Sequence, residues 1–500
     1  MQCICLKLYG NILKKFFAIS ALVFCFANGY SQNETPQQRY EQFKRQANEN
    51  FESFRKKANE QYAAFLRQAW EQYKVLPAIP KPKDETVPPI VLPDNDKDKP
   101  IESNPIPIKD VVTPPAPNPQ PVPISPIKEK TCPKEITVDI SYCGTECRVR
   151  MDNTVKINLS DCDNDNLSEA WSKLSEDGVM NNTIRDCLYL RESKNLCDWA
   201  YLNLLSTLAK AVYGESSNEA TLLTSFIYCQ SGYNMRLGRK DNRIYLLYAS
   251  KHGIYDIAYF KINDTNYYPF ECEQKRLEIC NAPYPQEKPL SLLITKNQKF
   301  KYQASDIRTL TSKQYPDIQV LVQVNKNLID FYNTYPTSEI DDNFMTRWAM
   351  YANTPLDEHV KEKLYPALMD KINGLNQLEA VNKLLNWVQT AFVYEYDDKV
   401  WGHDRAFFAE ETLYYPYCDC EDRSILFTRL VRDLLRLKTI LVFYPGHLAS
   451  AVCFTDNASG DYIPLNGKHY VITDPTYIGA PVGMTMPDMD NTQAHVILLE

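Results

Sequence analysis

A short string of residues near the C-terminus carries the groups that thiol catalysis needs. It reads Cys418-Asp-Cys-Glu-Asp-Arg-Ser-Ile-Leu-Phe and leads into an apolar segment with helical spacing over 422–437. Asp419 is a favourable helix N-cap, so Cys420 is predicted in the first helical turn. Free N–H groups and the dipole at a helix N-terminus stabilise a thiolate, which is the reactive form of cysteine. Cys420 is therefore the candidate nucleophile.

A thiol nucleophile needs a base beside it and a carboxylate that orients the base. His447 follows a Pro-Gly turn and begins an apolar predicted strand. Asp474 stands at the end of the next predicted strand, which Pro475 prevents from continuing. If the two strands are antiparallel neighbours, both side chains reach the head of the helix that begins near Cys420. The spacing thus predicts a Cys-His-Asp triad.

Three features together resemble the transglutaminase-like superfamily, which shares the papain-like fold. They are the order Cys, His, Asp, the Asp-Cys-x-Asp helix start and the Asp-Pro-Thr strand end, and they span about 376–480. The resemblance implies that Cys420 is the nucleophile, His447 the general base and Asp474 the orienting acid. The chain departs from the family at two points: Cys418 stands where glycine is usual, and the His-x-Trp pattern reads His-Leu-Ala.

The oxyanion of the reaction also needs hydrogen-bond donors. The backbone N–H of Cys420 is the expected first donor. Gln389, on the preceding predicted helix, is the candidate for a second donor.

Two other interpretations of the cysteines remain open at this point. Cys420 could form a disulfide with Cys453. Alternatively, Cys418, Cys420, His447 and Cys453 could bind zinc, since Cys-x-Cys is a tolerable ligand spacing. A zinc site would leave the Asp-Pro-Thr strand end unexplained.

Two further histidines are candidates for the site. His469 is a rival base, but it lies five residues before Asp474 on the same predicted strand, so strand alternation turns it away from that carboxylate. His403 follows Trp401 and Gly402 in a predicted loop, either on the surface or at the rim of the cleft.

The elements that position the triad form a predicted α+β catalytic domain over 301–500. Apolar residues at helical spacing over 377–392 predict a helix, and alternating segments after 437 predict strands. Residues 132–300 form a second predicted α+β domain, which holds nine cysteines that could be partly disulfide-bonded.

The second domain has a pattern of its own. Residues 214–226 resemble the segment that begins at Asp419: each follows an apolar helix that ends in Val-Tyr, and each leads into an apolar strand. In the best ungapped register Ser216 takes the place of Cys420, and Tyr245 falls near the place of the histidine. We hypothesise that 195–262 is a catalytically inactive copy of the same core; the alternative is an unrelated α+β domain.

The N-terminus predicts export. Residues 1–31 combine lysines, a short apolar run and small residues, as secretory signal peptides do. We therefore expect a periplasmic, cell-envelope or secreted protein. No later segment is apolar for long enough to predict a membrane helix.

Residues 32–75 are predicted to form an amphipathic helix with an eleven-residue repeat. Tyr40, Phe51, Tyr62 and Tyr73 fall in register, and this period keeps an apolar stripe nearly straight along a helix. The stripe favours self-association or contact with the cell envelope over the 40–73 helix; the alternative is packing on the protein's own body.

Residues 76–131 are predicted to be a proline-rich extended linker, because half of the chain's 32 prolines fall between Pro77 and Pro126. A spacer that holds the folded body away from its anchor is the simplest role for such a segment. The net charge of −8 makes a nucleic-acid partner improbable.

These features predict an exported acyl-transfer enzyme that acts on a protein or peptide through a thioester on Cys420. Hydrolysis of an amide is the favoured outcome, and protein cross-linking is the alternative. A non-catalytic binding or scaffold protein is the competing class. We expect no metal and no cofactor.

Overall fold

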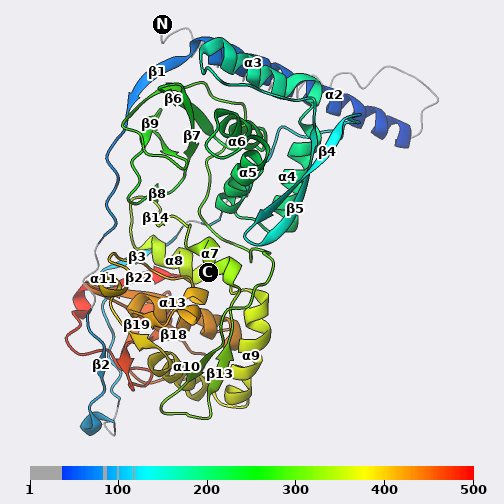
Figure 1. The fold of residues 1–500 in the computed structure, drawn as a ribbon. Coiled ribbons are helices and arrows are strands. Elements are labelled where there is room, and N and C mark those ends of the chain that lie inside the picture. The colour runs from blue at the N-terminus through cyan, green and yellow to red at the C-terminus, as the bar shows by residue number, and fades with distance from the viewer. Residues whose placement is uncertain (1–35, 83–86, 98–100, 115, 118) are drawn as a thin grey trace. The chain divides into compact units, whose positions relative to one another are not determined.

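The computed structural model describes residues 36–82, 87–97, 101–114, 116, 117 and 119–500. The predicted signal peptide, 1–31, lies outside these residues. The chain divides into a unit ending at Phe54 and a second unit, Arg55–Glu500. Its elements are a mixture of helices and antiparallel sheets, so the predicted α+β class is confirmed (Figure 1). No described helix is both long and apolar enough to span a bilayer.

The predicted N-terminal helix is confirmed as α2 (Pro36–Gln68). Tyr40 and Phe51, in its first part, are exposed. Tyr62, in the same repeat register, is buried and packs on Trp171 with ring centroids 4.4 Å apart. The last part of the helix thus packs on the protein's own body. Tyr73, which was predicted to continue the repeat, lies in strand β1 (Trp70–Lys74) instead.

The proline-rich segment differs from the prediction of a free spacer. Strand β2 (Ile90–Val91) pairs in parallel with β21 (Tyr477–Ile478), and β3 (Asp110–Val112) pairs in parallel with β22 (His495–Leu498). Ile106, between them, is buried in the C-terminal core. Short apolar stretches between the prolines keep their backbone N–H groups and bury their side chains, and proline is tolerated at a sheet edge. Residues 87–97 and 101–112 therefore lie along the C-terminal lobe as a strap, whereas Ile79 and Gln120 contact the N-terminal lobe.

The N-terminal lobe consists of helices packed on an antiparallel sheet. Its other elements are β4 (Glu135–Tyr142), β5 (Thr145–Asp152), α3 (Asn164–Ser175), η2 (Glu176–Gly178), α4 (Asn181–Ser193), α5 (Asp198–Tyr213), α6 (Asn218–Gln230), β6 (Met235–Lys240), β7 (Arg243–Ala249), β8 (Gly253–Ile254), β9 (Phe260–Ile262), β10 (Thr265–Pro269) and β11 (Arg276–Cys280). The sheet order is β1-β11-β6-β7-β10-β9. Helix α6 packs on β6 and β7, and α5 packs on α6 and β4 (Figure 1).

The C-terminal lobe is built in the same way. Its other elements are β12 (Arg308–Thr311), β13 (Gln319–Val322), α7 (Lys326–Tyr332), β14 (Ser338–Glu339), α8 (Thr346–Asn353), α9 (Glu358–Ile372), α10 (Gln377–Ala391), β15 (Val393–Tyr394), α11 (Asp397–Val400), α12 (Ala409–Tyr414), β16 (Tyr417–Cys418), α13 (Cys420–Leu430), η3 (Val431–Leu435), β17 (Lys438–Tyr444), β18 (His447–Cys453), β19 (Tyr462–Leu465) and β20 (Lys468–Thr473). Helix α13 packs on the hairpin β17–β18 (Figure 1).

The two six-stranded sheets share one topology. The C-terminal order is β3-β22-β17-β18-β20-β19, which matches β1-β11-β6-β7-β10-β9 strand for strand. In each sheet a helix leads into a central hairpin, the next two strands pair on one side of it, and the last strand pairs on the other. The outermost strand comes from the N-terminal segment in both sheets, antiparallel as β1 and parallel as β3.

Candidate active site

The candidate nucleophile begins a buried helix. Cys420 is the first residue of α13 and Asp419 is its N-cap residue, as predicted. Asp422 fixes this turn, because its carboxylate accepts hydrogen bonds from the backbone N–H of Asp419 at 3.3 Å and of Phe407 at 2.8 Å. Cys420 is 1% exposed. The helix N-terminus is the environment that favours a thiolate at this position.

His447 and Asp474 form a buried pair. His447 is the first residue of β18, after the two-residue turn of the hairpin, and Asp474 directly follows β20. The Nε2 atom of His447 lies 2.8 Å from Oδ2 of Asp474. Oδ1 of Asp474 accepts backbone hydrogen bonds from Thr476 at 2.8 Å and Tyr477 at 3.3 Å. The carboxylate is thus held so that it can orient the imidazole.

The other nitrogen of His447 is available for chemistry. Nδ1 is buried and has no hydrogen-bond partner within the described part of the chain. His447 and Cys420 line one small cavity, together with Trp348 and Phe443. With Nε2 engaged by Asp474, Nδ1 is the atom that can exchange a proton with the thiol.

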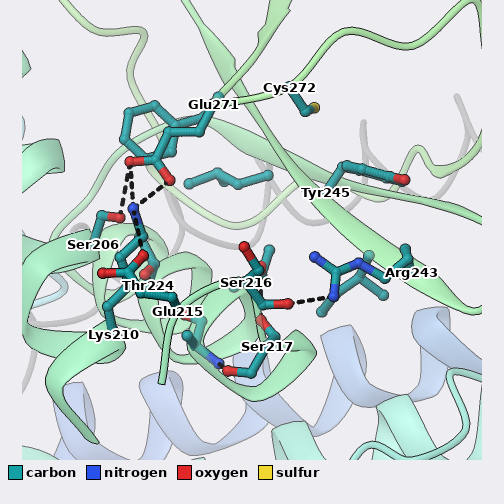
Figure 2. Close-up of a pocket in the computed structure, with 15 residues that line it drawn as sticks. Ser206, Lys210, Glu215, Ser216, Ser217, Thr224, Arg243, Tyr245, Glu271 and Cys272 are labelled. Atoms are coloured by element: carbon teal, nitrogen blue, oxygen red, sulfur yellow. Dashed lines mark hydrogen bonds and ion pairs between the residues drawn. The ribbon is translucent and has the colours of Figure 1, made fainter. Parts of the chain in front are cut away.

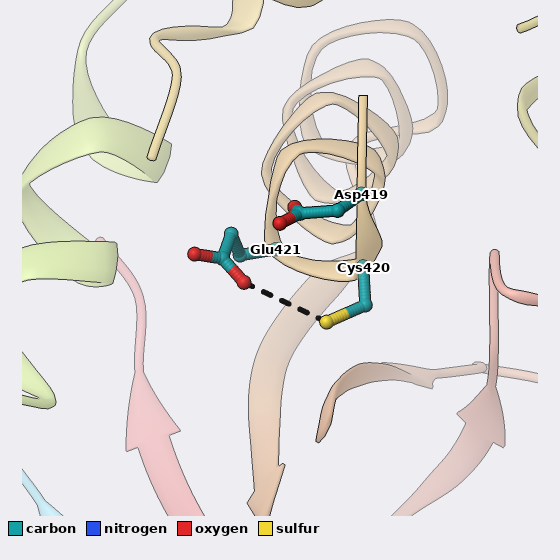
Figure 3. Close-up of side chains that lie close together, drawn as sticks. All are labelled: Asp419, Cys420 and Glu421. Carbon is teal, nitrogen blue, oxygen red and sulfur yellow. Dashed lines mark hydrogen bonds between the residues drawn. The ribbon is translucent and has the colours of Figure 1, made fainter. Parts of the chain in front are cut away.

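Glu421 adds a carboxylate that the sequence analysis did not assign to the site. The Cys420 thiol contacts Oε2 of Glu421 at 3.6 Å (Figure 3). Glu421 is buried and lines the same cavity as His447. A carboxylate beside a thiol opposes thiolate formation, so this side chain works against the helix N-terminus.

The acidic groups around Glu421 could hold a hard cation more readily than zinc. Side-chain ligand atoms of Asp397, Asp404 and Glu421 lie within 4.8 Å of one another, as do those of Asp419, Cys420 and Glu421. Carboxylate oxygens suit hard cations. Arg347 already neutralises part of this charge, since its Nη1 lies 2.6 Å from Asp404.

The zinc alternative has no such grouping. Among the described residues, neither group of possible metal ligands contains Cys418, His447 or Cys453. All twelve cysteines from Cys132 onward are free thiols, so the structure also contains no Cys420–Cys453 bond and no disulfide in the cysteine-rich lobe.

Cys418 has a structural contact. Its sulfur accepts a hydrogen bond from Nε of Arg423 at 3.5 Å. Burial raises the pKa of the Cys418 thiol. The buried Arg423 also donates to the carbonyls of Gln389 and Phe392, so Cys418 belongs to a group that joins α13 to α10.

Gln389 has a different task from the predicted oxyanion donor. Its Nε2 donates to the carbonyls of Asp474, Tyr477 and Ala480 at 2.8 to 3.0 Å, and its Oε1 accepts from the N–H of Gly479 at 3.1 Å. Both ends of the amide are therefore occupied, which corrects the prediction. Gln389 holds the loop that carries Asp474, and it supports the site from behind.

The two remaining histidines lie elsewhere. His469 is exposed and stacks on Tyr462, with ring centroids 4.1 Å apart. His403 is exposed in a loop, where its Nδ1 lies 3.0 Å from the carbonyl of Trp401. Neither lines the cavity that Cys420 and His447 share.

The strap contacts the β17–β18 hairpin, which carries His447. The sequence analysis did not predict this contact. The N–H of Val87 donates to the carbonyl of Gly446, next to His447, at 2.9 Å. The hydroxyl of Tyr394 donates to the carbonyl of Val87 at 3.3 Å. A signal was present, because apolar pairs such as Ile90-Val91 are unusual in a solvated proline-rich spacer.

The N-terminal lobe places other residues at the corresponding positions. Its hairpin β6–β7 also has a two-residue turn, so Arg243 is the counterpart of His447. Ser450, three residues after His447, pairs with Thr473. Leu246, three residues after Arg243, accepts from the N–H of Phe270 at 2.9 Å, which makes Glu271 the counterpart of Asp474.

The register proposed for the nucleophile position needs a correction. Helix α6 has Ser217 as its N-cap residue and begins at Asn218, so Asn218 stands where Cys420 stands in α13. Ser216 precedes the N-cap residue with φ of 58°. Tyr245 is the third residue of β7 and does not occupy the histidine position. The ungapped register failed because the loop before the helix differs between the lobes.

The counterparts cannot perform thiol catalysis. Asn218 binds the hairpin, since its Oδ1 accepts from the N–H of Ile244 at 3.1 Å and its Nδ2 donates to the carbonyl of Asn242 at 3.0 Å. Arg243 remains protonated and cannot act as a base. The first lobe has the topology of the second but has no thiol and no imidazole at these positions.

Comparison with known proteins yields no match: no family model, no curated protein and no solved structure is similar to the chain.

Proposed function

We propose that the protein is an exported acyl-transfer enzyme of the transglutaminase-like type, with the papain-like arrangement of a helix head against an antiparallel hairpin. The observation that carries the proposal is the His447–Asp474 contact of 2.8 Å, which leaves Nδ1 of the imidazole at the cavity shared with Cys420. An imidazole oriented by a carboxylate beside a buried thiol is the arrangement that activates a cysteine.

The reaction follows from these groups. Nδ1 of His447 takes the thiol proton, and the sulfur of Cys420 attacks the carbonyl carbon of an amide. The tetrahedral oxyanion forms near the head of α13, where the backbone N–H of Cys420 is the proposed donor. The imidazolium then protonates the departing amine, the C–N bond breaks and a thioester remains on Cys420.

The second half of the reaction releases the acyl group. His447 takes a proton from water, the resulting hydroxide equivalent attacks the thioester, and the thiol leaves with the proton returned by the imidazolium. Hydrolysis is the favoured outcome, which makes the protein a peptidase or amidase. A primary amine in place of water would give a cross-linking transglutaminase by the same steps.

Product masses test the proposal and separate its alternatives. The full chain is incubated with a mixed peptide digest, with and without 1,5-diaminopentane. We expect peptides cleaved by water or glutamine residues converted to acids, and we expect Cys420→Ala and His447→Ala to abolish both. Amine incorporation would identify a transglutaminase. Products that form equally in wild-type protein and Cys420→Ala would refute the thiol mechanism and favour a non-catalytic scaffold.

A further inference from the structure

The N-terminal lobe has a pocket at the position that corresponds to the cavity of Cys420 and His447 in the C-terminal lobe. The pocket has a volume of about 130 Å³ and is lined by α5, by the head of α6, by β7 and by residues 270–272 (Figure 2). Two of the counterpart positions, Arg243 and Glu271, contribute to its lining. The same place in the fold has therefore kept a concave surface while its chemistry has changed.

Glu271 is already neutralised within this pocket. Lys210 of α5 lies 2.7 Å from Glu271, and the hydroxyl of Ser206 donates to the same carboxylate at 3.2 Å. Figure 2 shows these three side chains together on one side of the pocket. Lys210 also lies 3.8 Å from the exposed Glu215, so the pocket lining holds two acidic side chains beside this lysine and Arg243.

Arg243 is different. Its guanidinium group donates to the backbone carbonyl of Ser216, which is a neutral acceptor. No carboxylate among the described residues forms an ion pair with it. Its side chain points toward Ser216 across the pocket from Glu271 (Figure 2). A guanidinium with a neutral partner is the group that recognises a carboxylate, because its parallel N–H donors match the two oxygens.

We propose that this pocket is a non-catalytic binding site for a carboxylate group of a peptide, with Arg243 as its principal contact. A volume of about 130 Å³ is below the range of about 300–1,000 Å³ typical of cofactor sites, so the pocket suits a small group such as one acidic side chain or chain end. The hydroxyls of Thr221 and Thr224 add polar groups to the wall. The site goes beyond the proposed catalysis and does not depend on Cys420.

Ligand-observed saturation-transfer NMR on the full chain tests the site with three probes. N-acetylglutamate amide offers a side-chain carboxylate, N-acetylglutamine offers a terminal carboxylate, and N-acetylglutamine amide is the neutral control. We expect the first or second probe to bind and the neutral probe to bind at least tenfold more weakly, and the stronger acidic probe identifies the source of the carboxylate.

Variants assign the binding to Arg243. Arg243→Met should weaken the acidic probe about tenfold or more, because it removes a charge-assisted contact. Arg276→Met, at an exposed arginine of the same sheet, should change binding less than twofold, and so should Cys420→Ala. Arg243→Lys should weaken binding of the acidic probe by an intermediate factor. If Arg243→Met has a lower melting temperature than wild type, the Lys variant tests the role of Arg243.

The absence of binding by both acidic probes would overturn the proposal. Equal binding of the neutral probe, or unchanged binding in folded Arg243→Met or Arg243→Lys, would overturn it as well. Loss of binding in Cys420→Ala alone would place the probe in the C-terminal cavity and also overturn it. If no catalysis is detected but the acidic probes still bind at Arg243, the proposed function fails and the proposed binding site stands.

Discussion

The heads of α13 and α6 occupy the same position in two sheets of one topology, yet they differ in what they can do. At α13 a thiol, an imidazole and a carboxylate lie at the ends of the helix and strands. At α6 the same positions hold Asn218, Arg243 and Glu271. The shared fold places three residues at corresponding positions in both lobes. The side chains at these positions determine which chemistry each lobe can support.

The lobes also share a way of holding the acidic residue. In the C-terminal lobe Gln389 of α10 donates hydrogen bonds to the backbone carbonyls of Asp474 and of the loop that follows it. In the N-terminal lobe Ser206 and Lys210 of α5 bind Glu271 directly. A helix earlier in the chain, α10 or α5, holds the acid or its loop in each lobe, but only Gln389 leaves the carboxylate itself free to contact an imidazole.

The largest expected effect is a loss of activity from substitutions at the head of α13 that substitutions at the head of α6 do not cause. Cys420→Ala and His447→Ala should each lower the rate of amide hydrolysis by about 10³-fold or more, because they remove the nucleophile or its base. Asn218→Ala and Arg243→Met should change the rate with a saturating neutral peptide less than about threefold. Rates of product formation by mass spectrometry measure both. Comparable losses at the two heads would show that the N-terminal lobe takes part in the chemistry.

Loss of the support behind Asp474 should rank second. Gln389→Leu removes four hydrogen bonds from the loop after Asp474, although the carbonyl of Tyr477 still accepts from the N–H of Ala480, so we expect about 2–4 kcal/mol lower stability and slower turnover. Ser206→Ala removes one hydrogen bond to Glu271 and should cost only about 1 kcal/mol. Urea unfolding measures both variants. Equal effects would mean that Gln389 is not a special support of the catalytic lobe.

A buried carboxyl group of the C-terminal lobe, that of Glu410, predicts that the stability of the protein depends on pH. Burial raises the pKa of Glu410 to about 8, well above its ordinary value of 4.5. The folded state therefore keeps this proton, and its contribution to stability falls as pH rises from about 4.5 to 8. Glu410→Gln should remove a slope of up to ~1.4 kcal/mol per pH unit in that window.

Thermal or urea unfolding of wild-type protein and Glu410→Gln from pH 5 to 8 measures this contribution. The variant should gain relative stability as pH increases. A difference between the two proteins that does not change with pH would contradict the raised pKa.

The smallest effect concerns the strap. Val87→Pro removes the N–H that donates to Gly446 beside His447, at a cost of about 1 kcal/mol, and should make Cys420 roughly fivefold easier to alkylate. Glu102→Pro, at an exposed residue of the same segment, is the matched control and should leave the rate unchanged. Equal rates in both variants would show that the strap does not limit access to the thiol.

The helix start and strand end that carry the candidate site were easier to predict from the sequence than the contacts that support them. The N-cap residue before Cys420 and the proline after Asp474 are local signals, and the structure has the predicted helix start and strand end at those residues. Gln389 and the strap act through pairings that span 85 to 387 residues of sequence, which no local pattern reveals. The counterpart positions were misplaced by two residues because strand pairing, and not sequence spacing, sets the register.

The alkylation profile of two native cysteines tests the central claim most directly. Cys420 lies at the head of α13, and Cys272 lines the pocket of the N-terminal lobe, where burial raises its pKa to about 12. The full chain is treated with iodoacetamide from pH 5 to 10, and peptide mapping follows each residue. We expect Cys420 to react well below pH 8, more slowly after His447→Ala, while Cys272 reacts only at high pH. Slow reaction of both thiols, with no effect of His447→Ala, would contradict the account.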